Sequence, residues 1–136
     1  MTVFIASLPD RAVIEIKGED TLPFLQDLVT ANVADLNPGQ AVHSALLTPQ
    51  GKILFDFFIV AVEGGVLLDC AAESAASLVQ RLTMYRLRRA LSIDQLDDLA
   101  VAAAWGDADP SSFSEGHVFP DPRNAELGSR ASATPA

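Results

Sequence analysis

The residue best suited to a chemical role is Asp56, because it is a carboxylate inside an otherwise apolar stretch. It stands in the segment Leu54 to Ile59, which reads Leu-Phe-Asp-Phe-Phe-Ile. Burying a bare carboxylate is costly, so Asp56 must be paired, be hydrogen-bonded or face a cavity. The alternative to a functional role is a strand residue that points outward and pairs with an Arg or Lys side chain. The sequence leaves both interpretations of Asp56 open.

A second candidate is a basic cluster on an otherwise acidic chain. It surrounds Tyr85 and consists of Arg81, Arg86, Arg88 and Arg89. Arginine offers two parallel N–H donors, so the cluster could recognise a carboxylate or a phosphate. The structural alternative is a helix C-terminus, where the negative end of the helix dipole favours cations. Tyr85 itself has the helical spacing of a core residue, which competes with a role in ligand binding.

The remaining reactive residues are few and isolated. The single cysteine, Cys70, can form no internal disulfide, and alone it can hold neither a structural zinc ion nor an iron–sulfur cluster. It follows a short apolar run, which favours a buried structural thiol over a reactive one. His43 and His117 are far apart and have no ligand-like neighbours, so we predict no metal site.

Composition and charge narrow the classes of function. The 136 residues fit one domain, and an apolar content of 49% is enough for an ordinary core. Eighteen acidic and nine basic residues give a net charge of -9, which disfavours general binding to nucleic acids or anionic membranes. We see no signal peptide and no apolar stretch long enough to cross a bilayer. A soluble cytoplasmic protein without nucleic-acid or membrane partners is therefore expected.

These candidate residues must be positioned by strands and two helices. The apolar spacing predicts one helix from about Thr21 to Val29, capped by Asp20, and another from Ala72 to about Arg89. Strands are predicted over residues 12–16, 41–47, 52–62, 66–70, 91–93, 99–105 and 118–119. Pro-Gln-Gly and Glu-Gly-Gly breaks favour hairpins between the middle strands. This order predicts an α+β fold with an antiparallel sheet of the split βαβ, ferredoxin-like type.

Five stretches of the chain together resemble the start of YgfZ-family proteins, which are folate-binding proteins related to the glycine-cleavage T-protein. The stretches are LPDRAVIEIKGED (8–20), FLQDLVTANV (24–33), SALLTPQGKILFDF (44–57), LTMYRLRR (82–89), and DPR with LGSR (121–130). Each is weak by itself. They occur in the right order and span most of the chain, so jointly they are specific.

The resemblance implies a folate-binding domain of the T-protein type and tetrahydrofolate, or a derivative of it, as cofactor. The signature of the family, a Lys-Gly-Cys-aromatic-x-Gly-Gln-Glu run, lies beyond the Asp-Pro-Arg segment and does not occur here. We therefore expect an incomplete domain. Residues 1–130 would be its N-terminal portion and residues 131–136 a flexible tail, with a missing C-terminal part of the same protein as one partner.

The resemblance also implies candidate folate contacts. The position of Asp56 resembles the T-protein aspartate that contacts the pterin region, where a carboxylate accepts hydrogen bonds from amino and N–H groups. The other candidates are Gln50, Lys52, Asn32, Tyr85 and Arg88. Lys52 could meet the glutamate tail of folate, or be an ordinary solvated lysine at a hairpin tip. Asn32 could contact the ligand, or only end the first helix.

Our main hypothesis is a reduced-folate-binding protein that supports iron–sulfur cluster assembly or repair, with iron–sulfur client proteins as partners. The rival is a tetrahydrofolate-dependent aminomethyltransferase of the glycine-cleavage type. That reaction must orient its substrate and stabilise the departure of ammonia, which Asp56 alone could not do. We therefore do not expect this chain to be an aminomethyltransferase itself. A third hypothesis is a half-domain that only pairs with its missing part.

Overall fold

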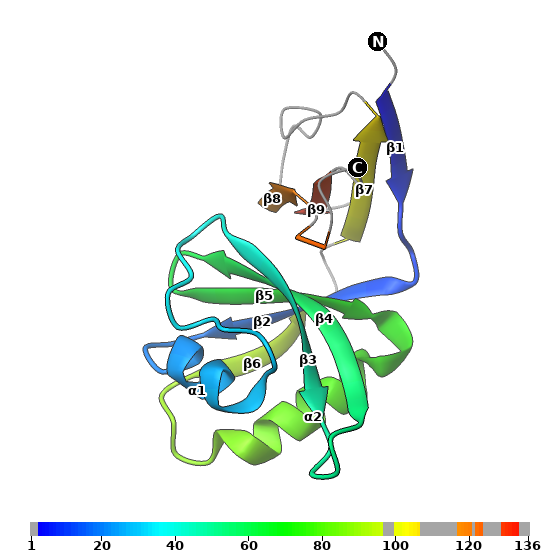
Figure 1. Ribbon diagram of the computed structural model, residues 1–136. Coiled ribbons are helices and arrows are strands. Elements are labelled where there is room, and N and C mark those ends of the chain that lie inside the picture. The colour runs from blue at the N-terminus through cyan, green and yellow to red at the C-terminus, as the bar shows by residue number, and fades with distance from the viewer. Residues whose placement is uncertain (1–2, 97–99, 107–116, 121, 124–128, 134–136) are drawn as a thin grey trace.

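The protein folds into two antiparallel sheets and two helices in a computed structural model that describes residues 3–96, 100–106, 117–120, 122–123 and 129–133 (Figure 1). The five-stranded sheet has the order β3-β4-β5-β2-β6, with β2 (Arg11–Lys17), β3 (Ala41–Leu47), β4 (Ile53–Val62), β5 (Gly65–Ala71) and β6 (Ser92–Leu96). The four-stranded sheet has the order β1-β7-β9-β8, with β1 (Val3–Ser7), β7 (Ala100–Gly106), β8 (His117–Pro120) and β9 (Ser129–Ala133). The helices are α1 (Thr21–Leu28) and α2 (Ala75–Arg86).

The topology of the five-stranded sheet confirms the predicted α+β fold. Strand β2 pairs antiparallel with β5 on one side and with β6 on the other. Strands β5 and β6 therefore run parallel to each other, with β2 between them and α2 as their connection. This is the split βαβ unit that the sequence predicts. Strands β3 and β4 extend the sheet by two antiparallel pairings beyond β5.

The two faces of this sheet carry different side chains because residues alternate along each strand. On β4, Phe57 and Ile59 are buried in the main core together with Leu78 and Leu82 of α2. The intervening Phe58 belongs to a second, smaller core with Val13, Val60, Leu67 and, from β7, Val101. In the view of Figure 1, α2 lies below β2, β5 and β6, α1 lies at the left, and the second sheet lies above the five-stranded one.

Several predicted features differ in detail. Asp20 does not cap α1 with its side chain; its Oδ2 accepts a hydrogen bond of 2.8 Å from the backbone N–H of Ala90 instead. The second helix begins at Ala75, after a 3-10 turn (Ala72–Ser74), and ends at Arg86 rather than near Arg89. Residue 99, the first of one predicted strand, lies outside the described residues.

The sequence did not predict β1 or β9, and therefore missed the second sheet. Strand β9 reads Ser-Arg-Ala-Ser-Ala and contains no β-branched or aromatic residue, so its propensity for extended structure is low. Its backbone nevertheless pairs with both β7 and β8. Tertiary pairing thus overrides local propensity. The strand includes residues 131–133, which we expected in the tail, whereas residues 134–136 lie outside the described part.

Candidate functional site

The candidate site lies on the face of the five-stranded sheet that points away from both helices, which we call the helix-free face. The pairing registers place His43, Phe58, Asp69 and Val13 in one row across β3, β4, β5 and β2. Side chains in such a row point to the same face and contact their neighbours. The helix-free face therefore brings an imidazole, an aromatic ring and a carboxylate side by side.

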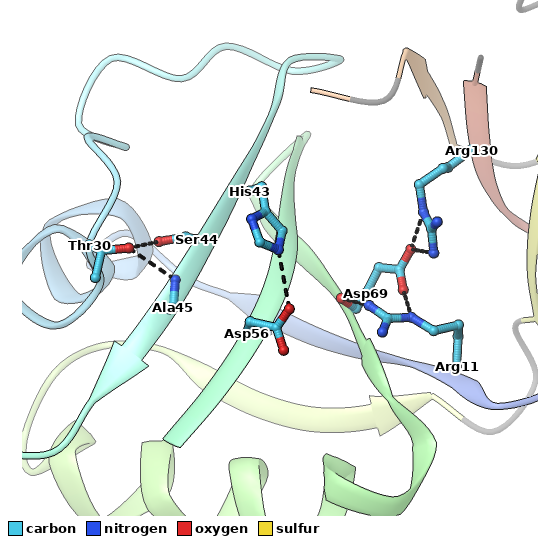
Figure 2. Close-up of polar contacts among 8 residues, drawn as sticks. All are labelled: Arg11, Thr30, His43, Ser44, Ala45, Asp56, Asp69 and Arg130. Atoms are coloured by element: carbon cyan, nitrogen blue, oxygen red, sulfur yellow. Dashed lines mark hydrogen bonds and ion pairs between the residues drawn. The ribbon is translucent and has the colours of Figure 1, made fainter. Parts of the chain in front are cut away.

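Asp69 is the centre of an ion-pair network that joins the two sheets. Its side chain is 1% exposed. Its Oδ1 accepts a hydrogen bond of 2.8 Å from Nε of Arg11, and its Oδ2 accepts one of 2.9 Å from Nε of Arg130 (Figure 2). Nη2 of Arg130 also lies 2.9 Å from Oδ2, as an ion pair. Arg130 comes from β9 of the second sheet, and Arg11 also donates to the backbone carbonyl of Asp69. Two arginines thus satisfy a carboxylate that could not be buried alone.

Phe58 gathers positive charge over its ring. The guanidinium groups of Arg130, Arg123 and Arg11 lie 4.5, 4.9 and 6.0 Å from the ring centroid. The imidazole of His43 lies 5.1 Å away, tilted by 57°. A cation near the face of an aromatic ring is attracted by the negative face of the ring's quadrupole. The ring therefore helps to hold three arginines within one small region of the helix-free face.

Asp56 lies two residues before Phe58 on β4 and points to the same face, at its solvent-exposed rim. Its side chain is 63% exposed, and Nε2 of His43 lies 3.3 Å from its Oδ2 (Figure 2). The outward-facing interpretation is therefore correct in geometry, although the partner is His43 rather than an arginine or lysine. A carboxylate with two oxygens and one such contact keeps most of its hydrogen-bond acceptor capacity for a ligand.

The predicted contacts at the hairpin tip lie in solvent. Gln50 and Lys52 are exposed in the turn that joins β3 to β4, and the described residues offer their side chains no hydrogen bond or ion pair. The turn is closed by Thr48, whose backbone N–H donates to the carbonyl of Lys52 over 2.7 Å. Gly51 adopts the positive φ of 87° that the sequence suggested.

Asn32 is engaged within its own loop. Its Oδ1 accepts a hydrogen bond of 3.2 Å from the N–H of Ala34. The loop is attached to β3 by Thr30, whose hydroxyl oxygen accepts a bond of 3.1 Å from the N–H of Ala45 and lies 3.3 Å from Oγ of Ser44 (Figure 2). Helix α1 ends at Leu28, with Val29 as its C-cap, so Asn32 does not end the helix; its observed contact lies within the loop that follows.

Tyr85 and Arg88 lie in the helical layer, on the opposite side of the sheet from Asp56. The core of α2 is formed by Ala75, Leu78 and Leu82. Tyr85 is 38% exposed, so the prediction that it faces the core is wrong, and Arg88 is exposed just after the helix. The structure therefore does not bring these two residues together with Asp56.

Cys70 is a buried structural thiol, as the sequence favoured. It packs in the main core on the helical side of β5. Desolvation by burial raises its pKa from 9.0 to about 11; Arg11 lowers it and Asp69 raises it by smaller amounts. The thiol is therefore protonated at neutral pH and lacks the thiolate character that reactive cysteines need.

Sequence reasoning missed the network around Asp69 and Phe58. The available signal was the run Val66 to Cys70, in which Asp69 is as isolated among apolar residues as Asp56. Its partner Arg130, like Arg123, belongs to the fifth family-like stretch. Other residues of that stretch, 121 and 127–128, lie outside the described part of the chain, as does the side chain of His117. No helix among the described residues is long and apolar enough to span a membrane.

Comparison with known proteins gives both sequence and fold relatives, although no family model matches the chain. It is 34% identical over 139 residues to the protein named iron-sulfur cluster assembly factor IBA57 homolog, mitochondrial, of Pyricularia oryzae, covering 95% of this chain and 35% of that one. It is 32% identical over 94 residues to an aminomethyltransferase of Bacillus velezensis, covering 68% of this chain and 26% of the enzyme.

A solved structure shares the fold. The glycine cleavage system aminomethyltransferase T from Bartonella henselae matches with a TM-score of 0.80 at 15% identity, over 97% of this chain and 42% of that chain. At this identity the match shows the fold alone. The chain spans about a third of the length of the curated relatives it matches, at 35% for the protein from Pyricularia oryzae.

Proposed function

We propose that this chain is the N-terminal part of an iron–sulfur cluster assembly factor of the IBA57 and YgfZ kind, and that its helix-free face contributes to binding of reduced folate. Support for the family comes from 34% identity that extends over 95% of the chain. Support for folate comes from a fold shared with an aminomethyltransferase of the glycine cleavage system. The proposal extends to iron–sulfur client proteins as partners of the whole protein.

The single observation that carries the proposed folate contact is the position of Asp56. Its carboxylate is 63% exposed on the helix-free face and has only His43 as a close polar partner among the described residues. The pterin ring of folate presents amino and N–H groups, which require an acceptor, and a carboxylate accepts without competing as a donor. The residues present therefore fit a pterin contact at Asp56.

The surroundings of Asp56 would assist that contact. Phe58 and the Asp69 network fix the backbone of β4 next to Asp56, so the carboxylate stands on a rigid strand rather than on a loop. His43 holds one side of the carboxylate. Gln50 and Lys52 remain proposed contacts at the hairpin tip, whereas Tyr85 and Arg88 lie in the other layer and are not part of this proposal.

Calorimetric titration with 5-formyltetrahydrofolate tests the proposed contact. Replacing Asp56 by Asn keeps the shape but removes the charge, so affinity should fall about tenfold to a hundredfold, the usual effect of losing a hydrogen bond to a charged acceptor. The matched control is Asp35→Asn, an exposed aspartate on the loop after α1, which should bind like the wild type. Equal affinity of wild type and Asp56→Asn, or no binding by the wild type, would contradict the proposal.

The Bacillus velezensis relative keeps aminomethyltransferase as a second candidate function. Complementation of a strain that lacks the glycine-cleavage aminomethyltransferase separates the two candidates. Rescue by the full-length gene would favour the enzyme; failure to rescue, with restored activity of iron–sulfur enzymes in a strain lacking the assembly factor, would favour our proposal. The cytoplasmic location stays a prediction, since the relative from Pyricularia oryzae is named a mitochondrial protein.

A further inference from the structure

The large apolar side chains that the described part of the chain exposes come from two segments only. Leu47 and Ile53 stand at the end of the β3–β4 hairpin, and Met84, Tyr85 and Leu87 stand at the end of α2. Ile53, Met84 and Leu87 are 67, 61 and 83% exposed. We call Met84, Tyr85 and Leu87, together with the half-buried Phe55 of the hairpin, the α2–hairpin surface. Large apolar groups that cluster in solvent are typical of an interaction site.

The two segments of the α2–hairpin surface are connected through a cleft. Phe55 of β4 and Met84 of α2 line the same cleft of about 310 Å³, together with Ser77, Gln80 and Arg81. Ile53 and Leu47 do not belong to this cleft: the β3–β4 pairing shifts register after Leu46, so Ile53 pairs with Leu47 and shares its side of the sheet, whereas Phe55 pairs with Leu46 on the helical side. Phe55 and Met84 thus border one depression between α2 and β4, which lie next to each other in Figure 1.

Arginines without ion-pair partners stand in this cleft and at the end of the helix that borders it. Arg81 lines the cleft, Arg86 is the last residue of α2 and Arg88 follows it; within the described residues the side chains of these three make no ion pair. Other arginines are paired: Arg11 and Arg130 with Asp69, and Arg89 with Asp27 over 2.7 Å. On a chain with a net charge of -9, unpaired cations gathered at one place are ready to meet acidic groups from outside.

Leu87 adds an independent observation. Its backbone has φ 51° and ψ -116°, a region that costs a non-glycine residue energy. Its side chain is 83% exposed and so gains little from packing within the chain. A glycine would relieve the strain at this position. Leu87 is thus strained and exposed, three residues after the exposed Met84. Such a residue is typical of a binding surface, because the strain is not needed to form the core.

From these observations we propose that the α2–hairpin surface is a docking site for an acidic amphipathic segment of a partner protein. Apolar side chains of the partner would enter the cleft between Phe55 and Met84, in the manner of a helix in a groove. Its carboxylates would pair with the arginines around the cleft, whose planar groups bind carboxylates bidentately. The site lies on the opposite layer from Asp56 and does not depend on folate.

The test uses a fluorescein-labelled amphipathic helical peptide built from leucine and glutamate, titrated with the purified full chain and followed by anisotropy. We expect saturable binding that weakens with salt, and weaker binding of the same peptide with lysine in place of glutamate. Met84→Gln with Leu87→Gln should weaken binding at least about tenfold, as expected for central apolar contacts. Arg81→Gln with Arg88→Gln should also weaken it, whereas the control Lys17→Gln on β2 should not.

Several results would overturn the proposal. The lysine peptide could bind equally well, or the Met84 and Leu87 variant could bind like the wild type. Binding to phosphatidylglycerol vesicles without binding to the glutamate peptide would assign the surface to a membrane. Self-association of the chain that Met84→Gln abolishes, again without peptide binding, would assign it to a second copy.

The variant Leu87→Gly separates docking from folding. Removal of the strained leucine should raise the melting temperature, because glycine adopts the backbone conformation freely. The same change should weaken peptide binding, because the most exposed apolar side chain is lost. A stabilised variant with unchanged peptide affinity would remove Leu87 from the proposed site.

Discussion

The two faces of the five-stranded sheet differ in chemistry, although neighbouring residues of the same strands supply them. One face is apolar and buried, and the other carries charged groups. The helical face buries Phe57, Ile59 and Cys70 among apolar side chains of α1 and α2. The helix-free face carries the alternate residues of the same strands, among them Phe58 next to Phe57 and Asp69 next to Cys70. Its interior is stabilised by ion pairs and cation–π contacts, and its rim exposes Asp56. Both faces thus contribute to stability, whereas the groups that we propose to contact folate stand on the helix-free face.

This comparison teaches that buried and exposed carboxylates in similar sequence surroundings have different roles. Asp56 and Asp69 both interrupt apolar runs. Asp69 is 1% exposed and held by two arginines, while Asp56 is 63% exposed beside one histidine. The first carboxylate is buried and surrounded by its arginines, so a ligand could reach it only by displacing them. The second contributes little to stability and is open to solvent.

The largest expected effect is that of Asp69→Ala. The change leaves Arg130 buried and Arg11 partly buried without their partner, and breaking a buried ion pair in this way costs about 3–5 kcal/mol. Urea unfolding of the two proteins measures the difference. The control is Asp27→Ala, which removes a surface pair with Arg89 and should cost at most about 1 kcal/mol. A loss for Asp69→Ala as small as that of the control would contradict the inter-sheet role of Asp69.

A smaller effect should come from Cys70 at alkaline pH. Burial favours its neutral thiol, so the folded-state pKa of about 11 lies above the unfolded value near 9. Stability from this group is complete below pH 9 and falls as pH rises from 9 to 11, by about 1.4 kcal/mol per pH unit and about 2–3 kcal/mol in total. Comparing unfolding of wild type and Cys70→Ala between pH 8 and pH 11 isolates the contribution. Parallel pH dependences would show that Cys70 is not desolvated.

The smallest effect on stability should be that of Asp56→Asn and of His43→Gln. The pair is solvent-exposed, and such pairs contribute about 0–1 kcal/mol. Thermal unfolding should place both variants close to the wild type, although Asp56→Asn is expected to lose affinity for folate. A loss near that of Asp69→Ala would mean that the rim is structural, and the distinction between the two carboxylates would fail.

Much of the five-stranded sheet was predictable because its signals are local. Strand β3 was predicted at its observed bounds, Ala41–Leu47, since turn residues delimit an apolar run on both sides. The breaks at Gly51 and Gly64 marked hairpins, and both glycines adopt positive φ. The split βαβ order followed from the sequence of these elements.

The parts that could not be predicted depend on long-range pairing. Strand β9 forms only because β7 and β8 lie beside it. The partner of Asp69, Arg130, is 61 residues away, and nothing local connects them. Tyr85 shows a third cause: it continues the stripe of Leu78 and Leu82, which is buried as predicted, but it stands in the last turn of α2, and the spacing does not show where along the helix that burial ends.

The central claim is that the helix-free face, and not the helical layer, meets reduced folate. The most direct measurement is an NMR titration of the labelled chain with 5-formyltetrahydrofolate. It follows the imidazole of His43 and the methyl groups of Val60 on one face, and the methyl groups of Leu78 and Leu82 on the other. Our account predicts saturable shifts for His43 and Val60 with Leu78 and Leu82 nearly unchanged. Shifts confined to Leu78 and Leu82, or no shifts at all, would contradict it.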